Sequence, residues 1–343
     1  MGKTGTTSLQ AFLDRNRARL ADRGWLYPRS IGRTRHAQFG LWIRPDDELA
    51  DAIGDRRPGS RPYDDVAHLR REVPRRLLEE IDRTGLRRVL ISDEALYAAS
   101  EPSLERLRRF ADEHASEVRL VCYLRRQDDL LVSHYQQVVK VRATRTLAAR
   151  VAERDLSPTY DYHHRLLTWL RIVEPDELVV RRFEPGRFRN GSLYDDFVEA
   201  AGLGIPTDDL PPRNRNESLD AESVELLRLL NLYRKEHGAD GVPDNRTLVP
   251  VLAESGTGPT LTLPEPELDR FMARWADSNA AVARDLLGEP EGRLFTTSRR
   301  AEGTTTLQRL DPARLDHYLG LLELPEQIHA PLRALVEREA LRH

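Results

Sequence analysis

The chain has few of the residues that form disulfides, metal clusters or membrane spans. Its 343 residues include a single cysteine, Cys122, so an internal disulfide is excluded and a cysteine-rich metal site is not expected. Apolar neighbours of Cys122 predict an inert core residue. No run of about 18 apolar residues occurs, so we expect no membrane span. No signal-peptide pattern is seen, and we expect a cytoplasmic location.

An excess of charge of one sign is also lacking. The formal net charge is -3, although charged residues make up 32% of the chain. This balance gives no reason to expect attraction to nucleic acid or to membranes. Lysine is scarce: Lys3, Lys140 and Lys235 stand against fifty arginines. A lysine at position 3 is therefore conspicuous, because most positive positions in this chain hold arginine.

The most informative pattern is the opening stretch, which reads MGKTGTTSLQ. Its two glycines allow a tight turn and a close approach to a ligand. Apolar residues at helical spacing follow, so the turn is expected to open a helix. A helix N-terminus beside a lysine and several hydroxyl groups favours the binding of phosphate or sulfate.

Three interpretations of this stretch compete. Residues 2–4 match the end of the G-x-x-x-x-G-K-[ST] loop of nucleotide triphosphatases, but the first glycine of that loop would lie before Met1. Residues 3–7, KTGTT, resemble the 5′-phosphosulfate loop of sulfotransferases that use 3′-phosphoadenosine 5′-phosphosulfate (PAPS). A glycine-rich turn with helix-capping threonines is the third interpretation. The resemblance implies cofactor binding by Lys3, Thr4, Gly5, Thr6, Thr7 and Ser8.

Strands and helices alternate along the first two thirds of the chain. We expect strands at 88–92, 118–124 and 177–183, and a short extended piece at 25–28. We expect helices at 8–24, 66–83, 102–115, 128–141, 160–173 and 192–202. This order predicts an α/β fold, a three-layer parallel sheet with helices on both faces, and ligands bind at the carboxyl ends of such strands.

The remaining segments receive less specific predictions. Residues 29–65 are rich in Arg, Asp, Pro and Gly and are expected to form a surface insertion, with a short helix near 46–53. Helices are expected at 220–236 and 265–287, joined by a link at 237–264. We expect one α/β domain over residues 1–300 and a helical extension of the same domain over 301–343.

A second motif follows the strand expected at 118–124. Sulfotransferases that use PAPS place an arginine at the end of such a strand and a serine eight positions later, and both bind the 3′-phosphate. Arg125 and Ser133 have this spacing, and Arg126 leaves the register open by one residue. An arginine fork suits phosphate oxygens. The alternative is an ordinary Arg/Asp helix cap with a solvated face.

Weaker likenesses to the same family occur at 179–184, 197–203, 215–219, 279–283 and 294–295. Together with the opening loop, they make the chain resemble a bacterial PAPS-dependent sulfotransferase over roughly residues 1–300. The resemblance implies a P-loop-like fold, in which a buried strand runs into the phosphate loop. No strand precedes the loop in this sequence, so the first strand is expected to be missing.

The missing strand predicts poor stability of the chain as written. Loss of a buried central strand should cost several kcal/mol, against a total domain stability of about 5–15 kcal/mol. We therefore expect no cooperative melting well above about 60 °C.

The resemblance also implies residue roles for sulfuryl transfer. Lys3 is expected to stabilise the charge on the leaving bridging oxygen, without a metal ion. Two residues are candidates for the general base. Glu94 follows the strand expected at 88–92, where a helix first-turn acid is the plainer interpretation. His36 lies in the expected insertion, where it could equally be a solvated surface histidine.

The acceptor is expected to be a small-molecule or carbohydrate hydroxyl, and the sequence does not indicate the oligomeric state. One rival is a P-loop kinase or nucleotide triphosphatase, with Asp93 as the magnesium carboxylate. Another is a degenerate nucleotide-binding protein without transferase activity.

Overall fold

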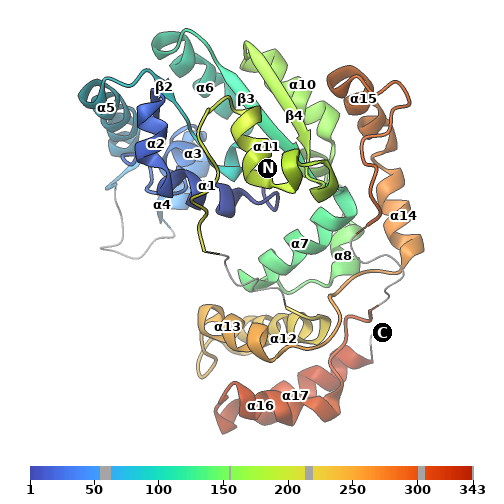
Figure 1. Ribbon diagram of the computed structural model, residues 1–343. Helices are drawn as coiled ribbons and strands as arrows, with labels where there is room; N and C mark the ends of the chain where they lie inside the picture. The colour runs from blue at the N-terminus through green and yellow to red at the C-terminus, as the bar shows by residue number, and fades with distance from the viewer. Residues whose placement is uncertain (55–62, 154–155, 213–218, 300–305, 342–343) are drawn as a thin grey trace. The chain divides into compact units, whose positions relative to one another are not determined.

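The computed structural model describes residues 1–54, 63–153, 156–212, 219–299 and 306–341 (Figure 1). The chain divides into two compact units whose segments interleave along the sequence. The first unit comprises Met1–Arg125, Ser157–Arg213 and Asp277–Thr297. The second comprises Arg126–Leu156, Asn214–Ala276 and Ser298–His343. This division differs from the expected boundary at residue 300, because two internal segments also belong to the second unit.

The strands lie in the first unit and pair in parallel. Strand β1 (Trp25–Leu26) pairs with β2 (Arg88–Val89), and β3 (Arg119–Leu124) pairs with β4 (Glu177–Arg182). Strands β2, β3 and β4 lie within the predicted strand segments, and β1 lies within the short extended piece expected at 25–28. They form two separate two-stranded sheets among the described residues, where a single sheet was expected. The α/β class is therefore confirmed at the level of parallel strands alternating with helices.

Helices of the first unit alternate with these strands. They are α1 (Thr6–Arg15), α2 (Arg17–Asp22), α3 (Ala37–Trp42), α4 (Asp46–Gly54), α5 (Val66–Thr84), α6 (Glu101–His114), α9 (Ser157–Tyr160), α10 (Tyr162–Ile172), α11 (Leu193–Ala200) and α15 (Ala276–Leu287). Short 3₁₀ turns add η1 (Glu94–Ala98), η2 (Pro185–Arg187) and η3 (Arg189–Gly191).

Local chemistry explains where these helices stop. The helix expected at 8–24 breaks at Asn16, whose side-chain amide donates to the carbonyl of Phe12 at 2.9 Å. Helix α5 begins at Asp65, whose carboxylate accepts from the His68 amide, and ends at Gly85 with φ of 68°. An aspartate cap and a left-handed glycine are strong helix start and stop signals.

Several residues between 31 and 49 form part of the core, so the prediction of a surface insertion over 29–65 was wrong for the described part of this segment. Ile31, Phe39, Trp42 and Ile43 are at most 8% exposed and pack in one apolar cluster with residues of α5 and α10. The segment looked polar on average, but its few apolar residues recur at helical spacing and gather on one face. Residues 55–62 lie outside the described part of the chain.

The second unit is helical wherever the structure describes it. Its helices are α7 (Gln127–Lys140), α8 (Leu147–Val151), α12 (Ala221–His237), α13 (Asn245–Ser255), α14 (Glu265–Ala273), α16 (Leu315–Leu321) and α17 (Glu326–Ala340), with the 3₁₀ turn η4 (Pro312–Arg314). Helix α13 falls in the expected link at 237–264. Pro250 within it masked the pattern, although Asp244 caps its start by accepting from the Arg246 amide.

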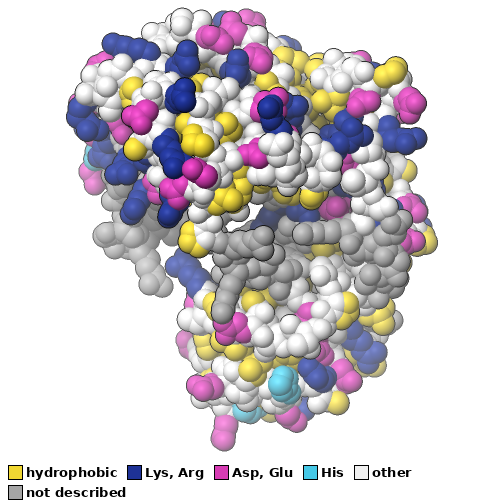
Figure 2. Space-filling model, in the orientation of Figure 1, with side chains coloured by type: hydrophobic (Ala, Val, Ile, Leu, Met, Phe, Trp, Pro, Cys, Tyr) yellow, Lys and Arg dark blue, Asp and Glu magenta, His cyan; other side chains and the backbone are white. Residues whose placement is uncertain are grey.

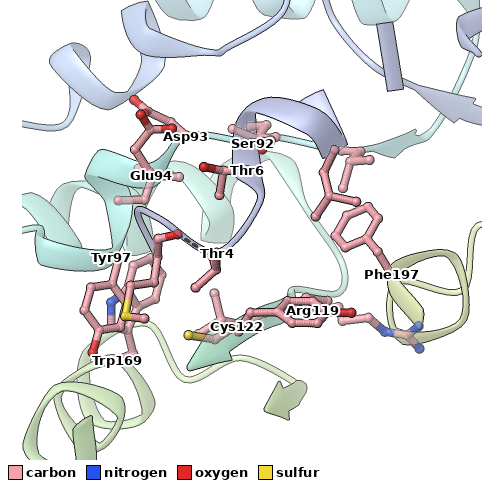
Figure 3. Close-up of a pocket in the computed structure, with 18 of the residues that line it drawn as sticks. Thr4, Thr6, Ser92, Asp93, Glu94, Tyr97, Arg119, Cys122, Trp169 and Phe197 are labelled. Carbon is pink, nitrogen blue, oxygen red and sulfur yellow. Dashed lines mark hydrogen bonds between the residues drawn. The ribbon is translucent and has the colours of Figure 1, made fainter. Parts of the chain in front are cut away.

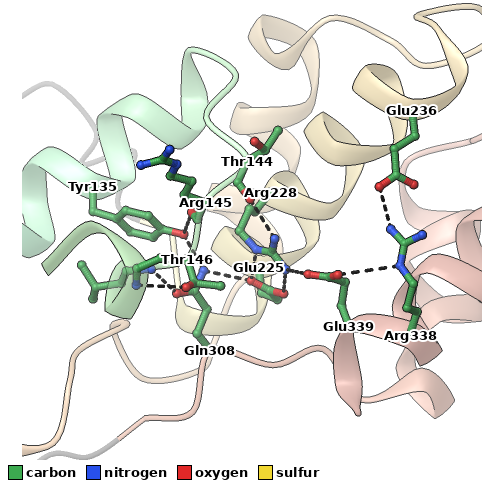
Figure 4. A network of polar contacts seen from close by, with 12 residues as sticks. Tyr135, Thr144, Arg145, Thr146, Glu225, Arg228, Glu236, Gln308, Arg338 and Glu339 are labelled. Carbon is green, nitrogen blue, oxygen red and sulfur yellow. Dashed lines mark hydrogen bonds and ion pairs between the residues drawn. The ribbon is translucent and has the colours of Figure 1, made fainter. Parts of the chain in front are cut away.

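A buried network of polar side chains lies inside the second unit (Figure 4). Arg228, with its side chain 2% exposed, donates to both carboxylate oxygens of Glu225 at 2.6 and 2.8 Å. It also donates to Glu339 at 3.0 Å and to the carbonyl of Thr144 at 2.8 Å. The amide of Gln308 donates to Glu225. Buried charges persist when they are paired and hydrogen-bonded in this way.

The visible surface mixes charges of both signs. Lys and Arg side chains intermingle with Asp and Glu on the face that Figure 2 shows. This matches the small net charge of the sequence. Among the described helices, none has the length and apolar composition needed to cross a membrane.

Candidate functional site

The N-terminal loop folds tightly before helix α1. The hydroxyl of Thr4 donates to the carbonyl of Met1 at 2.6 Å, and the backbone of Lys3 is left-handed with φ of 61°. Gly5 forms the N-cap with φ of 73°, without a side-chain cap hydrogen bond, and no acidic residue occupies the first turn. The helix start therefore keeps its partial positive charge uncompensated by a carboxylate.

Position 5 requires glycine for two reasons: its backbone is left-handed, and a side chain there would clash with its neighbours. A Cβ atom at this position would lie 2.4 Å from Cδ2 of Leu193 and 3.4 Å from a ring carbon of Phe183. The turn therefore packs against the start of α11 and the end of β4.

Arg125 meets this loop from the end of β3. Its Nη1 donates to the carbonyl of Lys3 at 2.9 Å, across 122 positions of sequence. The guanidinium lies 5.9 Å from the centre of the Phe183 ring, and the residue is 9% exposed. The hydroxyl of Tyr162 donates to the carbonyl of Arg125 at 2.5 Å. One residue from each of the two motifs that carry the family resemblance, Lys3 and Arg125, therefore lies at one rim of the first unit.

The neighbouring candidates belong to the second unit. Arg126 forms an ion pair with Asp128 at 3.1 Å, and Asp128 also lies 3.6 Å from Arg299. Ser133 lies on α7. Arg125 is the better candidate for a phosphate ligand, because its guanidinium meets the loop at Lys3. Joint action of Arg125 and Ser133 stays a prediction, since the two residues belong to different units.

Glu94 lies at the start of η1. Its Oε1 is 3.3 Å from Nη1 of Arg35, and its side chain is 30% exposed. Its Oε2 is buried and has no hydrogen-bond partner among the described residues. An unpaired buried carboxylate oxygen is able to accept a proton, so the geometry keeps Glu94 as a candidate base.

Asp93 and Arg35 surround this glutamate. Asp93 accepts from Nε of Arg35 at 2.7 Å and from the Ala95 amide at 3.0 Å, with its side chain 1% exposed. It thus acts as a buried cap of η1, which does not favour the magnesium role of the rival interpretation. Arg35 was missed at the level of sequence, because nothing distinguished it from the other arginines.

His36 is fully buried, and its geometry does not support the role of general base. Its Nδ1 accepts from the Ser92 amide at 2.9 Å, so Nε2 carries the proton and donates to the carbonyl of Pro28 at 3.0 Å. Its ring also packs on Tyr27, with centroids 4.5 Å apart. Burial lowers the pKa of His36 to about 4, so the ring is neutral near pH 7. The imidazole of His36 therefore links the backbone at Pro28 to the backbone at Ser92.

A cavity of about 170 Å³ lies below the loop (Figure 3). Residues 90–92, which continue β2, line it, as do residues 119–123 of β3. Trp169 of α10 and Phe197 of α11 line it as well, together with Met1. We call this cavity the strand slot. Its exposed lining is mostly apolar, but Thr4, Thr6, Asp93 and Glu94 also line it, whereas Lys3 and Arg125 do not. A multiply charged nucleotide is thus better matched to the rim than to the slot.

The structure describes only some of the residues that carry the weaker likenesses to the sulfotransferase family. Phe183 contacts Arg125 as above, and the carboxylate of Glu184 accepts from the amides of Thr296 and Thr297, both at 2.9 Å. Most of the motif at 215–219 lies outside the described residues. Within the described ranges, no cluster of three or more His, Cys, Asp or Glu side chains is arranged to hold a metal ion.

Comparison with known proteins assigns no activity. No family model matches the chain, and no solved structure matches it. A curated protein of Archaeoglobus fulgidus is 29% identical over 200 residues, which cover 58% of this chain. The match covers 54% of that protein, so the chain spans about half the length of the curated relative. The relative is described only as an uncharacterized protein.

Proposed function

We propose that this protein is a PAPS-dependent sulfotransferase that acts on a hydroxyl group of a small-molecule or carbohydrate acceptor. The observation that supports this most is the 2.9 Å hydrogen bond from Arg125 to the carbonyl of Lys3. It brings together two motifs that the resemblance assigned to opposite ends of one nucleotide. The finer fold, a P-loop-like three-layer sheet, is part of the same proposal.

The residues of the rim fit an anionic nucleotide. Helix α1 begins without an acidic residue, and Gly5 lets the backbone turn sharply beside it. Such a turn exposes amide groups that suit phosphate oxygens. Arg125 offers a guanidinium, which binds phosphate bidentately. PAPS, when bound, supplies an activated sulfuryl group whose transfer leaves a bisphosphate.

Three roles follow for the chain's own residues. Lys3, with the hydroxyls of Thr6 and Thr7, stabilises negative charge at the 5′ end of the nucleotide. Arg125 holds the 3′-phosphate. Glu94 accepts the proton of the acceptor hydroxyl on Oε2, while Arg35 fixes the other carboxylate oxygen. The sequence did not suggest this role for Arg35, which is inferred from its contact with Glu94.

Substitution of Lys3 tests the proposed role of this residue in sulfuryl transfer. Lys3→Ala is expected to lower kcat by about 10²–10³, because one preorganised charge at the leaving group is lost. The measurement is transfer of labelled sulfate from PAPS to a panel of sugar and phenol hydroxyls. Lys235→Ala is the matched control, since Lys235 is exposed on α12 of the second unit. Equal turnover in the two variants would remove Lys3 from the mechanism.

Nucleotide binding by the same purified protein distinguishes the proposed function from the two alternatives. Binding of ATP with Mg²⁺ in preference to 3′-phosphoadenosine 5′-phosphate (PAP) would favour a nucleotide triphosphatase or kinase. Binding of PAP without transfer to any acceptor would favour a degenerate nucleotide-binding protein.

A further inference from the structure

Burial lowers the pKa of three arginines among the described residues: Arg106, Arg165 and Arg234. Arg165 and Arg234 are each 8% exposed, and both donate hydrogen bonds to neutral oxygen atoms of the chain. Arg106 differs, because its guanidinium makes no hydrogen bond to the residues that the structure describes, and its side chain is 28% exposed. A ligand can therefore reach Arg106, and the chain itself does not satisfy its donors.

Arg106 lies beside a second arginine, with which it shares one carboxylate. An oxygen of Asp46, the first residue of α4, accepts from Nε and Nη2 of Arg70 at 3.1 and 2.5 Å and lies 3.6 Å from Nη2 of Arg106. Arg70 also donates to the carbonyl of Arg44. Nη1 of Arg70 and Nε of Arg106 are buried without a hydrogen-bond partner in the described part of the chain. We call Arg70 and Arg106 the arginine pair, and both are short of acceptors.

Trp42 of α3 fixes the two helices that carry the arginine pair. Its indole Nε1 donates to the carbonyl of Arg70 in α5 at 3.2 Å. Its ring packs against Phe110 of α6, one turn after Arg106, with the ring centroids 5.2 Å apart. Trp42 is 8% exposed and belongs to an apolar core cluster of the first unit. Because the core holds both helices, the arginine pair is preorganised, which reduces the entropy cost of binding a ligand.

The charge around the arginine pair is positive. The charged groups that act on Arg106 are Arg70 and Arg109, which repel its charge, and Asp46, which attracts it. Together these side chains are three guanidinium groups and one carboxylate, so they carry an excess of two positive charges. A divalent anion matches that excess, whereas a monovalent anion would leave one positive charge uncompensated.

We propose that the arginine pair binds a divalent oxyanion, either the free ion or the phosphate group of a phosphate monoester, and that Asp46 competes with it for the guanidinium donors. Guanidinium groups bind phosphate oxygens through pairs of hydrogen bonds. Two such groups from different helices suit a tetrahedral anion. The side chain of Asp46 is 69% exposed, so a ligand can displace its carboxylate into water. The site shares no residue with the rim at Lys3 and Arg125 and does not depend on sulfuryl transfer.

Calorimetric titration of the full chain with inorganic phosphate at about pH 8, where phosphate is largely divalent, measures this binding. Arg106→Gln is expected to raise the Kd about tenfold or more, because one charged hydrogen-bond donor is lost. Arg71→Gln is the matched control, since Arg71 is exposed on α5 and its substitution removes the same charge. Phosphate that binds at the rim contributes equally in both variants, so their difference reports on the arginine pair. Equal Kd values in the two variants, or a parent chain that does not bind phosphate, would overturn the proposal.

Asp46→Asn should change the same titration in the opposite direction. Loss of the competing carboxylate is expected to tighten phosphate binding about 3–10-fold, whereas Asp47→Asn, which removes an exposed charge from the same turn of α4, should have little effect. Unchanged affinity in Asp46→Asn would overturn the competition. Acetate that binds as tightly as phosphate would overturn the preference for a divalent anion. Glucose 6-phosphate distinguishes the two sources: affinity equal to that of phosphate or higher supports a phosphate monoester, and weaker binding supports the free ion.

Discussion

The interiors of the two units differ in chemistry. The first unit has parallel strands on both sides of a mostly apolar slot, with Glu94 in its lining and with Lys3 and Arg125 at the rim. In the second unit, the helices enclose a charge: Arg228 bonds two buried carboxylates and a carbonyl (Figure 4). Open space leaves room for a ligand, whereas a buried and paired ion network favours one packing of the helices.

The largest expected effect concerns the second unit. Arg228→Met would leave Glu225 and Glu339 buried without their cation. Removing one partner of a buried pair typically costs about 3–5 kcal/mol. The free energy of opening of α12 and α17, measured by native-state hydrogen exchange, should fall by that amount.

The control is an arginine on α17, the helix that carries Glu339. Arg338 is 48% exposed and pairs with Glu236 at 2.7 Å. Exposed pairs contribute about 0–1 kcal/mol, so Arg338→Ala should change little. Similar losses in the two variants would mean that the buried network does not hold the second unit together.

The next effect is a pH dependence of the first unit. The pKa of His36 falls from 6.5 to about 4 on folding, chiefly because burial disfavours the charged ring. The unfolded chain therefore binds a proton at a higher pH than the folded chain does. This contribution to stability is fully present above pH 6.5 and is lost as the pH falls toward 4, by roughly 3 kcal/mol.

Denaturant unfolding between pH 4 and 7.5 measures this loss. His36→Asn should flatten the pH dependence relative to the parent chain. Tyr27→Phe, which alters packing beside the ring but keeps the imidazole, should leave the slope in place. An unchanged slope in His36→Asn would contradict the buried neutral state.

The smallest effect concerns the slot. Cys122→Leu adds methylene groups where the side chain lines open apolar space. Cavity filling commonly adds about 0.5–2 kcal/mol of stability. Leu227→Phe is the matched change in the second unit, where Leu227 is fully buried, and overpacking there should cost about 1–3 kcal/mol. Thermal melts of both variants compare the two interiors, and destabilisation by Cys122→Leu would indicate a slot without usable space.

Sequence patterns identified local structure well. Continuous apolar runs inside β3 and β4 located these strands, because both faces of a parallel sheet are covered. The helix over 66–83 was confirmed within a residue, since an aspartate and a glycine mark its ends. These signals work because each depends on residues close together in the chain.

Features that depend on distant residues escaped prediction. The burial of His36 arises from backbone groups of Pro28 and Ser92, which periodicity does not reveal. Arg35 became relevant only through its contact with Glu94. The interleaving of the two units was likewise invisible, because it depends on contacts between segments far apart in the chain. The approach of Arg125 to Lys3 was anticipated only through a family resemblance.

The central claim is that the loop at Lys3 and the guanidinium of Arg125 bind one bisphosphate nucleotide. Calorimetric titration of PAP into the parent chain, Arg125→Ala and Arg87→Ala tests it most directly, Arg87 being 78% exposed in the same unit. The account predicts that Arg125→Ala raises Kd about 10–100-fold, as expected for loss of a charged hydrogen bond, while Arg87→Ala leaves it unchanged. A parent chain that does not bind PAP, or equal affinity in all three proteins, would contradict the claim.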